Sequence, residues 1–282
     1  MHGDGLKDYL LEKNKVFGSQ QAIINFSLFS LLPVIVILFY VYKRDRFPEP
    51  PRTVFITLIL GFGITLPIGF LIPIVEGFIE NIRWGVEAKH FYQAFVRAAF
   101  LEETMKFLVI IIYCLHLDKF DEPMDALVYG VAASLGFAAY ENWEYVLYAF
   151  GSEGSQGASS VAWIRSFTAV PLHALCGVFM GFFLMDAIFE KEHAKLNLFL
   201  SLFFPICLHG FYNYLIMSES FAIKNYWIFI LLGIFLIRAF FVFKKERKLQ
   251  IERSGEAVHN KTLPITKDVA LTILASGFLV IA

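Results

Sequence analysis

Long apolar stretches separated by short polar connections dominate this sequence from residue 21 onward. Seven of them reach the length of roughly 20 residues that one helix needs to cross the hydrocarbon core of a bilayer. They are 21–42, 53–79, 91–116, 124–150, 161–190, 196–217 and 223–243. Because these stretches are too long and too uniformly apolar for barrel strands, the pattern predicts an all-α, polytopic transmembrane helix bundle of seven or eight spans.

The eighth candidate span, 268–282, is short, and we expect it either to cross the membrane or to lie at its interface. The distribution of polar residues divides the chain into a polar N-terminal tail at 1–20, a transmembrane domain at 21–243 and a polar segment at 244–267. Small residues in 151–160 predict a flexible loop, and the polarity of 244–267 predicts a mobile tail segment. Glycine and proline interrupt 61–75, which indicates a kink in the second span.

Composition supports a membrane protein and excludes several other classes. Hydrophobic residues make up 57% of the chain and charged residues 17%, whereas soluble domains average about 45–50% and about 25%. The net charge of −1 provides no basic field for nucleic acid. The 3 cysteines lie in apolar stretches without CxxC spacing, so neither a disulfide framework nor a zinc ribbon is indicated.

The distribution of lysine and arginine predicts the orientation, because cytoplasmic connections of membrane proteins carry an excess of both. Basic residues cluster in 43–52, 191–195 and 244–248, three connections that fall on one side of the predicted bundle. We therefore expect the N-terminus outside, with the 43–52 loop and the 244–267 segment in the cytoplasm.

Rare polar side chains lie inside four of the apolar stretches. A charge at mid-bilayer costs about 2.5–3.5 kcal/mol, so such residues usually face the interior of the bundle and mark a functional site. At about 1.5 Å per residue, the residues in the third, fifth and sixth stretches lie near one depth. The polar residues are Glu102, Glu103 and Lys106 in the third stretch, Glu141 and Asn142 in the fourth, His173 in the fifth, and His209 and Asn213 in the sixth.

Helical spacing adds detail to this group. Glu102 and Lys106 are four residues apart and are expected to pair on one helix face, while Glu103 points about 100° away toward a neighbouring helix. In the fifth stretch, Gly177 and Gly181 form a pattern of small residues that allows two helices to approach closely.

Carboxylates and imidazoles at one depth suit hydrolysis. A glutamate beside a histidine activates water as a general base, and histidines with a glutamate also bind zinc and leave a position open for water. His209 and Asn213, four residues apart, are suited to stabilising an oxyanion. Each residue alone also fits a structural role in helix packing. A proton-coupled transporter and a catalytically inactive membrane scaffold are the alternative functions.

Four blocks of sequence resemble the PrsW family of intramembrane proteases in order and spacing. They are "FLEETMKFL", "DEPMDALVYGVAASLGFAAYEN", "AVPLHALCGVFMG" and "LFFPICLHGFYNYL", and they fall within 91–217. The resemblance implies a multi-pass peptidase of the bacterial cytoplasmic membrane. It also implies that the substrate is a membrane-anchored protein within the lipid bilayer, such as an anti-sigma factor that controls a stress response.

The resemblance also assigns the site. The motif residues carried over by position are Glu102, Glu103, Lys106, Phe137, Glu141, His173, His209 and Asn213. The wider superfamily, with CAAX prenyl proteases and bacteriocin-processing enzymes, includes members argued to be metal-free glutamate proteases, so zinc is one of two options. We expect Glu102 to act as general base on a water held with His173. If zinc is bound, we expect His173, His209 and Glu141 as ligands, with Glu103 as the alternative carboxylate.

Overall fold

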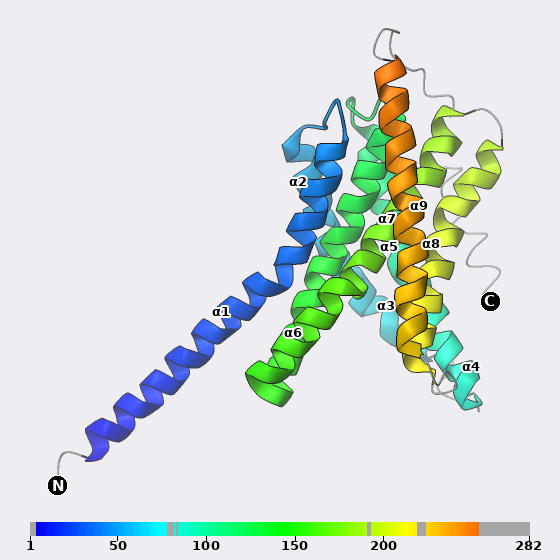
Figure 1. The fold of residues 1–282 in the computed structure, drawn as a ribbon. Helices are drawn as coiled ribbons and strands as arrows, with labels where there is room; N and C mark the ends of the chain where they lie inside the picture. Colours follow the sequence, from blue (N-terminus) through cyan, green and yellow to red (C-terminus); the bar gives the residue numbers. More distant parts are fainter. Residues whose placement is uncertain (1–3, 78–81, 83, 191–192, 219–223, 254–282) are drawn as a thin grey trace.

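The computed structural model of the chain describes residues 4–77, 82, 84–190, 193–218 and 224–253, and contains no strand in these ranges (Figure 1). The all-α prediction is therefore confirmed. The helices are α1 (Asp4–Arg44), α2 (Pro51–Gly63), α3 (Thr65–Gly77), α4 (Val86–Phe91), a π-helical segment (Tyr92–Phe100), α5 (Leu101–Ile112), a short 3₁₀ turn (Cys114–His116), α6 (Pro123–Phe167), α7 (Ala169–Phe189), α8 (Ala194–Met217) and α9 (Lys224–Arg253).

Five helical segments of the described chain are long and apolar enough to cross a membrane. They are 20–44, 51–77, 123–189, 194–217 and 226–252. The third of these is 67 residues long and contains the predicted span 124–150 and all but the last residue of the predicted span 161–190. The predicted span 91–116 is absent from the five and carries three charged residues near its middle. The predicted stretch 268–282 lies outside the described residues, so a total of seven or eight spans stays a prediction.

The chain reverses direction near Gly154, which has φ 69 and ψ −158 inside α6. A Cβ added to Gly177 would collide with the carbonyl oxygen of Gly130, and one added to Gly181 with that of Ala126. These pairs run in opposite directions along the sequence, so the first part of α6 and α7 are antiparallel and in backbone contact. The close crossing predicted from the two glycines of α7 is therefore confirmed.

The prediction of a flexible loop at 151–160 is wrong, because these residues are helical on both sides of Gly154. A single glycine with positive φ provides the change of direction, since it has no Cβ to oppose that conformation. The prediction of a mobile segment at 244–267 is also wrong for 244–253, which continue α9, and 254–267 lie outside the described residues. The polar tail 1–20 is helical from Asp4 onward. The second predicted span is divided into α2 and α3 at Ile64, within the stretch 61–75 where the kink was predicted.

The segment containing α6 and α7 lies at the centre of the bundle, between α1 and α2 on one side and α8 and α9 on the other (Figure 1). In the most apolar window of 123–189, 78% of residues are buried within the protein, against 11% for 20–44 and 22% for 226–252. The outer helices expose large apolar side chains, among them Phe39, Phe55 and Phe229. Such a surface is suited to lipid contact. Polar groups are instead expected in the interior of the bundle, where the central helices pack.

Candidate active site

The polar residues singled out in the sequence come together from four helices. Helix α5 contributes Glu102, Glu103 and Lys106, while α6, α7 and α8 contribute Glu141, His173 and His209. A π-helical segment leads directly into α5, and π-helical turns are frequent at functional sites. The side chains are packed away from the surface: Glu103 and Lys106 are 0% exposed, His173 1%, His209 2% and Glu102 9%.

Glu103 is the link between α5 and α8. Its Oε1 accepts hydrogen bonds from Lys106 Nζ at 2.7 Å and from His209 Nδ1 at 2.8 Å. The expected pairing of Lys106 with Glu102 is present as an ion pair, with Nζ and Oε2 3.9 Å apart, but this contact is longer than a hydrogen bond. One helical turn brings both glutamates near Lys106, and the closer one is three residues away rather than four.

His173 is held from two sides. Its Nδ1 lies 3.0 Å from Lys106 Nζ, and its Nε2 lies 2.9 Å from Glu141 Oε2. Because an ammonium group only donates, Nδ1 is the acceptor and the Nε2–H group donates to Glu141. The ring of Phe137 packs edge-on against His173, with centroids 5.4 Å apart, and lies 4.4 Å from Lys106 Nζ. Phe137 and Glu141, one helical turn apart on α6, therefore both contact His173.

Arg165 belongs to this cluster and was missed by the sequence reasoning. Its Nη2 donates to Glu141 Oε2 at 2.6 Å, and its Nε donates to Asn142 Oδ1 at 3.0 Å. Its guanidinium lies 4.1 Å from the ring centroid of Tyr145. Asn142 also donates to the carbonyl oxygen of Ser30 at 2.6 Å, which connects the cluster to α1. An arginine inside the apolar stretch 161–190 was the available signal.

Three acceptor atoms of the cluster have no hydrogen bond with the described residues, namely Glu102 Oε2, Glu103 Oε2 and His209 Nε2. Glu102 Oε2 is buried and has no hydrogen-bond partner among the described residues. His209 donates from Nδ1 to Glu103, which leaves its Nε2 as an acceptor 3.8 Å from Glu102 Oε2. The rings of His173 and His209 are perpendicular, with centroids 5.0 Å apart. A small polar ligand such as water therefore has partners on both sides.

The residues of the cluster fit zinc. Glu102, His173 and His209 each offer one ligand atom, and these atoms lie within 4.8 Å of one another. His173 would bind through Nδ1, which accepts from Lys106 in this structure, so Lys106 would have to release it. Two imidazoles and a carboxylate are a donor set that zinc hydrolases use, and Glu102 provides a buried oxygen that makes no hydrogen bond with the described residues. Glu141 and Glu103, the carboxylates expected as ligands, are each bonded to a histidine and to a cation. They therefore occupy the positions of groups that orient metal-binding histidines.

Asn213 is the one predicted site residue that the structure leaves apart from this network. It lies one turn beyond His209 on α8 and is half-buried. Its side chain makes no hydrogen bond with the described residues, so its role stays a prediction.

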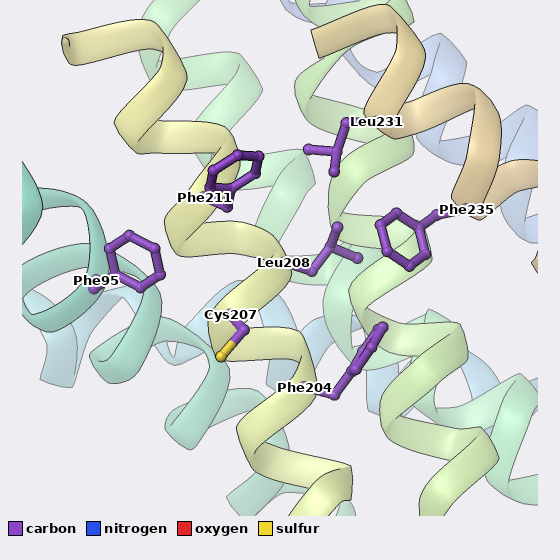
Figure 2. Close-up of a pocket in the computed structure, with 7 residues that line it drawn as sticks. All are labelled: Phe95, Phe204, Cys207, Leu208, Phe211, Leu231 and Phe235. Atoms are coloured by element: carbon purple, nitrogen blue, oxygen red, sulfur yellow. The ribbon is translucent and has the colours of Figure 1, made fainter. Parts of the chain in front are cut away.

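An apolar cavity of about 360 Å³ lies against the same helix, between the π-helical segment, α8 and α9 (Figure 2). Leu208 lines it, and His209 points about 100° further around α8, so the cavity and the polar cluster use different faces. The lining offers no charged group, which assigns the chemistry to the cluster rather than to the cavity. The lining residues are Phe95, Phe204, Cys207, Leu208, Phe211, Leu231 and Phe235.

Comparisons with known proteins agree with this arrangement. Residues 49–242 match the model of the PrsW family of intramembrane metalloproteases. Protease PrsW of Bacillus subtilis (strain 168) is 34% identical over 220 residues, which cover 77% of this chain and 92% of that protein. Protease PrsW of Geobacillus kaustophilus is 34% identical over 199 residues, covering 69% and 82%. No solved structure matches the chain.

These similarities extend well beyond the four motif blocks and favour a protease over a transporter or an inactive scaffold. They include the helices that carry both glutamates, both histidines and Glu141. The chain belongs to the PrsW family of intramembrane metalloproteases, and it is a multi-pass membrane protein and an intramembrane protease.

Proposed function

We propose that this protease hydrolyses a peptide bond in or beside the membrane segment of a single-pass protein in the bacterial cytoplasmic membrane, with a membrane-anchored anti-sigma factor as the substrate. The observation that carries the proposal is the pair of unused acceptors, Glu102 Oε2 and His209 Nε2, within a buried polar cluster. A helical substrate must unwind locally, because its peptide carbonyls are engaged in hydrogen bonds along the helix.

Glu102 acts first, as general base. It takes a proton from a water held between its Oε2 and His209 Nε2, and the water oxygen attacks the carbonyl carbon of the substrate. His209 replaces His173 as the expected partner of this water, because both ring nitrogens of His173 are engaged. Glu103 accepts from His209 Nδ1 and thereby keeps the Nε2 lone pair directed at the water. Asn213 donates to the oxyanion. When the carbon–nitrogen bond breaks, Glu102 returns the proton to the leaving amine.

Zinc, when bound by Glu102, His173 and His209, supplies a Lewis acid that acidifies water and stabilises negative charge. Glu102 is then a ligand rather than the base, and its loss removes activity in either case. Glu141 and Glu103 orient the two histidines through their ring nitrogens.

Metal content distinguishes these chemistries. The family description and the donor set lead us to expect about one zinc per chain, measured by elemental analysis of purified protein. A zinc chelator should stop cleavage, and added zinc should restore it. His209→Ala should lose the metal, whereas Asp118→Asn, at an exposed position between α5 and α6, should retain it. Full activity of metal-free protein would exclude the zinc mechanism.

The substrate class is tested by co-expression with tagged candidate anti-sigma factors. We expect a shortened fragment with the wild-type chain and none with Glu102→Gln. Cleavage of an unrelated single-pass protein but of no anti-sigma factor would reject the substrate class while leaving the protease activity intact.

The domain and orientation assignments belong to the same proposal. Residues 21–243 form the peptidase domain, with its motif core at 91–217. The N-terminus lies outside, and the 43–52 loop lies in the cytoplasm with the end of α9. Support comes from Lys43 and Arg44 in the last turn of α1 and from the basic residues of 244–248 at the same end of the bundle (Figure 1).

A further inference from the structure

A second cluster of carboxylates lies at the end of the bundle where α1 leads into α2, α6 begins and α9 ends (Figure 1). Asp45, Glu49 and Asp125 are 7%, 3% and 0% exposed. One carboxylate oxygen from each of Asp45, Glu122 and Asp125 lies within 4.8 Å of the others. Asp125 precedes Glu141 by 16 residues (141 − 125) of α6, or about 24 Å along the helix, so this cluster is separate from the active site.

Two aspartates of the cluster have one oxygen fixed and the other unused. Asp45 Oδ1 accepts from the backbone of Phe47 at 2.9 Å and from Gln250 Nε2 at 2.8 Å. Asp125 Oδ2 accepts from the backbone of Asp121 at 2.8 Å and of Glu122 at 2.7 Å. The remaining oxygens, Asp45 Oδ2 and Asp125 Oδ1, are buried and accept no hydrogen bond from a nitrogen or hydroxyl donor of the described residues. The Asp125 carboxyl also lies within hydrogen-bond contact of the Glu49 carboxyl. Donors on one oxygen thus hold each carboxylate in place while the other oxygen is available to a ligand.

A ligand that binds these carboxylates would need to carry positive charge. No salt bridge joins Asp45, Glu49, Glu122 or Asp125 to a basic side chain in the part of the chain that the structure describes. The arginines on either side of Asp45 are directed at aromatic rings, with guanidinium carbons 4.6 Å from the centroid of Tyr40 and 5.9 Å from that of Phe47. Buried carboxylates without a counter-charge are unfavourable, and pairing or metal coordination relieves them.

The pKa values of Asp45 and Glu122, which lie outside the membrane-spanning helices, are also raised. Burial raises the pKa of Asp45, and Gln250 only partly offsets the shift. Burial, together with the charges of Asp45, Asp121 and Glu49, raises the pKa of Glu122 to about 7. Ionisation of these two carboxyl groups is therefore unfavourable in the protein alone, and a bound cation would favour it.

We propose that Asp45, Glu122 and Asp125 bind a hard divalent cation, Ca²⁺ or Mg²⁺, at this end of the bundle. Both ions prefer carboxylate and carbonyl oxygens, and the group contains no histidine or cysteine that would favour zinc. The ion joins the loop after α1 to the start of α6. The end of α9 is joined to the same site through Gln250, because its Nε2 donates to Asp45 and, at 2.6 Å, to Glu122.

The test uses the full chain in detergent micelles, in buffer freed of divalent ions. Adding CaCl₂ or MgCl₂ should raise the unfolding midpoint by about 5 °C at saturation, and NaCl of equal ionic strength should not. Tb³⁺ provides a second readout. The hydroxyl of Tyr129 donates to Glu49 Oε2 at 2.7 Å, so tyrosine excitation should produce terbium emission. Competition by Ca²⁺ and by Mg²⁺ separates the two ions.

Asp45→Asn and Asp125→Asn keep the side-chain shape and one accepting oxygen while removing a charge. Each should require at least about tenfold more cation for the same response, and each should be no less stable than wild type without cation, since repulsion is reduced. Asp118→Asn and the active-site variant Glu102→Gln should respond like wild type. An equal response in both cluster variants, no response in wild type, or stabilisation only by lowering the pH would overturn the proposal.

Discussion

Replacing Glu102 with glutamine should reduce peptide cleavage at least about 1000-fold without unfolding the protein. Glutamine has the same shape, but it neither accepts a proton from water nor replaces a carboxylate ligand of zinc. Glu102 Oε2 has no hydrogen-bond partner among the described residues, so the substitution breaks no hydrogen bond of that atom and removes only its longer ion-pair contacts with Lys106 and His209. Cleavage of a tagged single-pass substrate in liposomes measures the activity, and the thermal unfolding midpoint measures the fold.

The neighbouring glutamate provides the contrast. Glu103 is fully buried and bonded to Lys106 and His209, so Glu103→Gln should lower stability as well as activity. Glu144→Gln, at an exposed position on α6, is the control that should change neither. Wild-type cleavage by the Glu102 variant would remove this residue from the mechanism.

The convergence of the polar residues was predictable because helix geometry sets depth. The rise per residue places Glu102, His173 and His209 at similar depths, and helical spacing directs Glu103 away from Glu102. Glu103 indeed contacts α8 through His209. Because charges in lipid are unfavourable, these side chains were also expected to face the interior of the bundle.

The individual partners were not predictable, because they depend on how each helix is rotated. The spacing along α5 allows Lys106 to contact either Glu102 or Glu103. In the structure Lys106 lies closer to Glu103, and it also contacts Phe137 and His173. Arg165 reaches Glu141 because the chain reverses at Gly154 and brings the end of α6 back beside its middle. The small-residue sequence of 151–160 suggested a loop, and so concealed that reversal.

Replacing Arg165 with glutamine should have the second large effect, a loss of stability. Its pair with Glu141 is mostly buried, with side chains 14% and 19% exposed. Removing one partner of a buried pair leaves an uncompensated charge and typically costs about 3–5 kcal/mol. We therefore expect Arg165→Gln to lower the free energy of unfolding by about 3 kcal/mol, measured by chemical denaturation in micelles. Activity should also fall, because Glu141 Oε2 accepts from both Arg165 and His173.

A double-mutant cycle separates the pair from its surroundings. Glu141→Gln combined with Arg165→Gln leaves no buried charge at this position, so the double variant should regain at least about 1 kcal/mol relative to the sum of the single changes. The matched exposed pair is Arg97 with Glu76, whose side chains are 34% and 49% exposed. Arg97→Gln should cost less than about 1 kcal/mol, because an exposed pair contributes little to stability. Additive effects of Arg165→Gln and Glu141→Gln would show that the two side chains act independently, and Arg165 would then have no part in orienting His173 through Glu141.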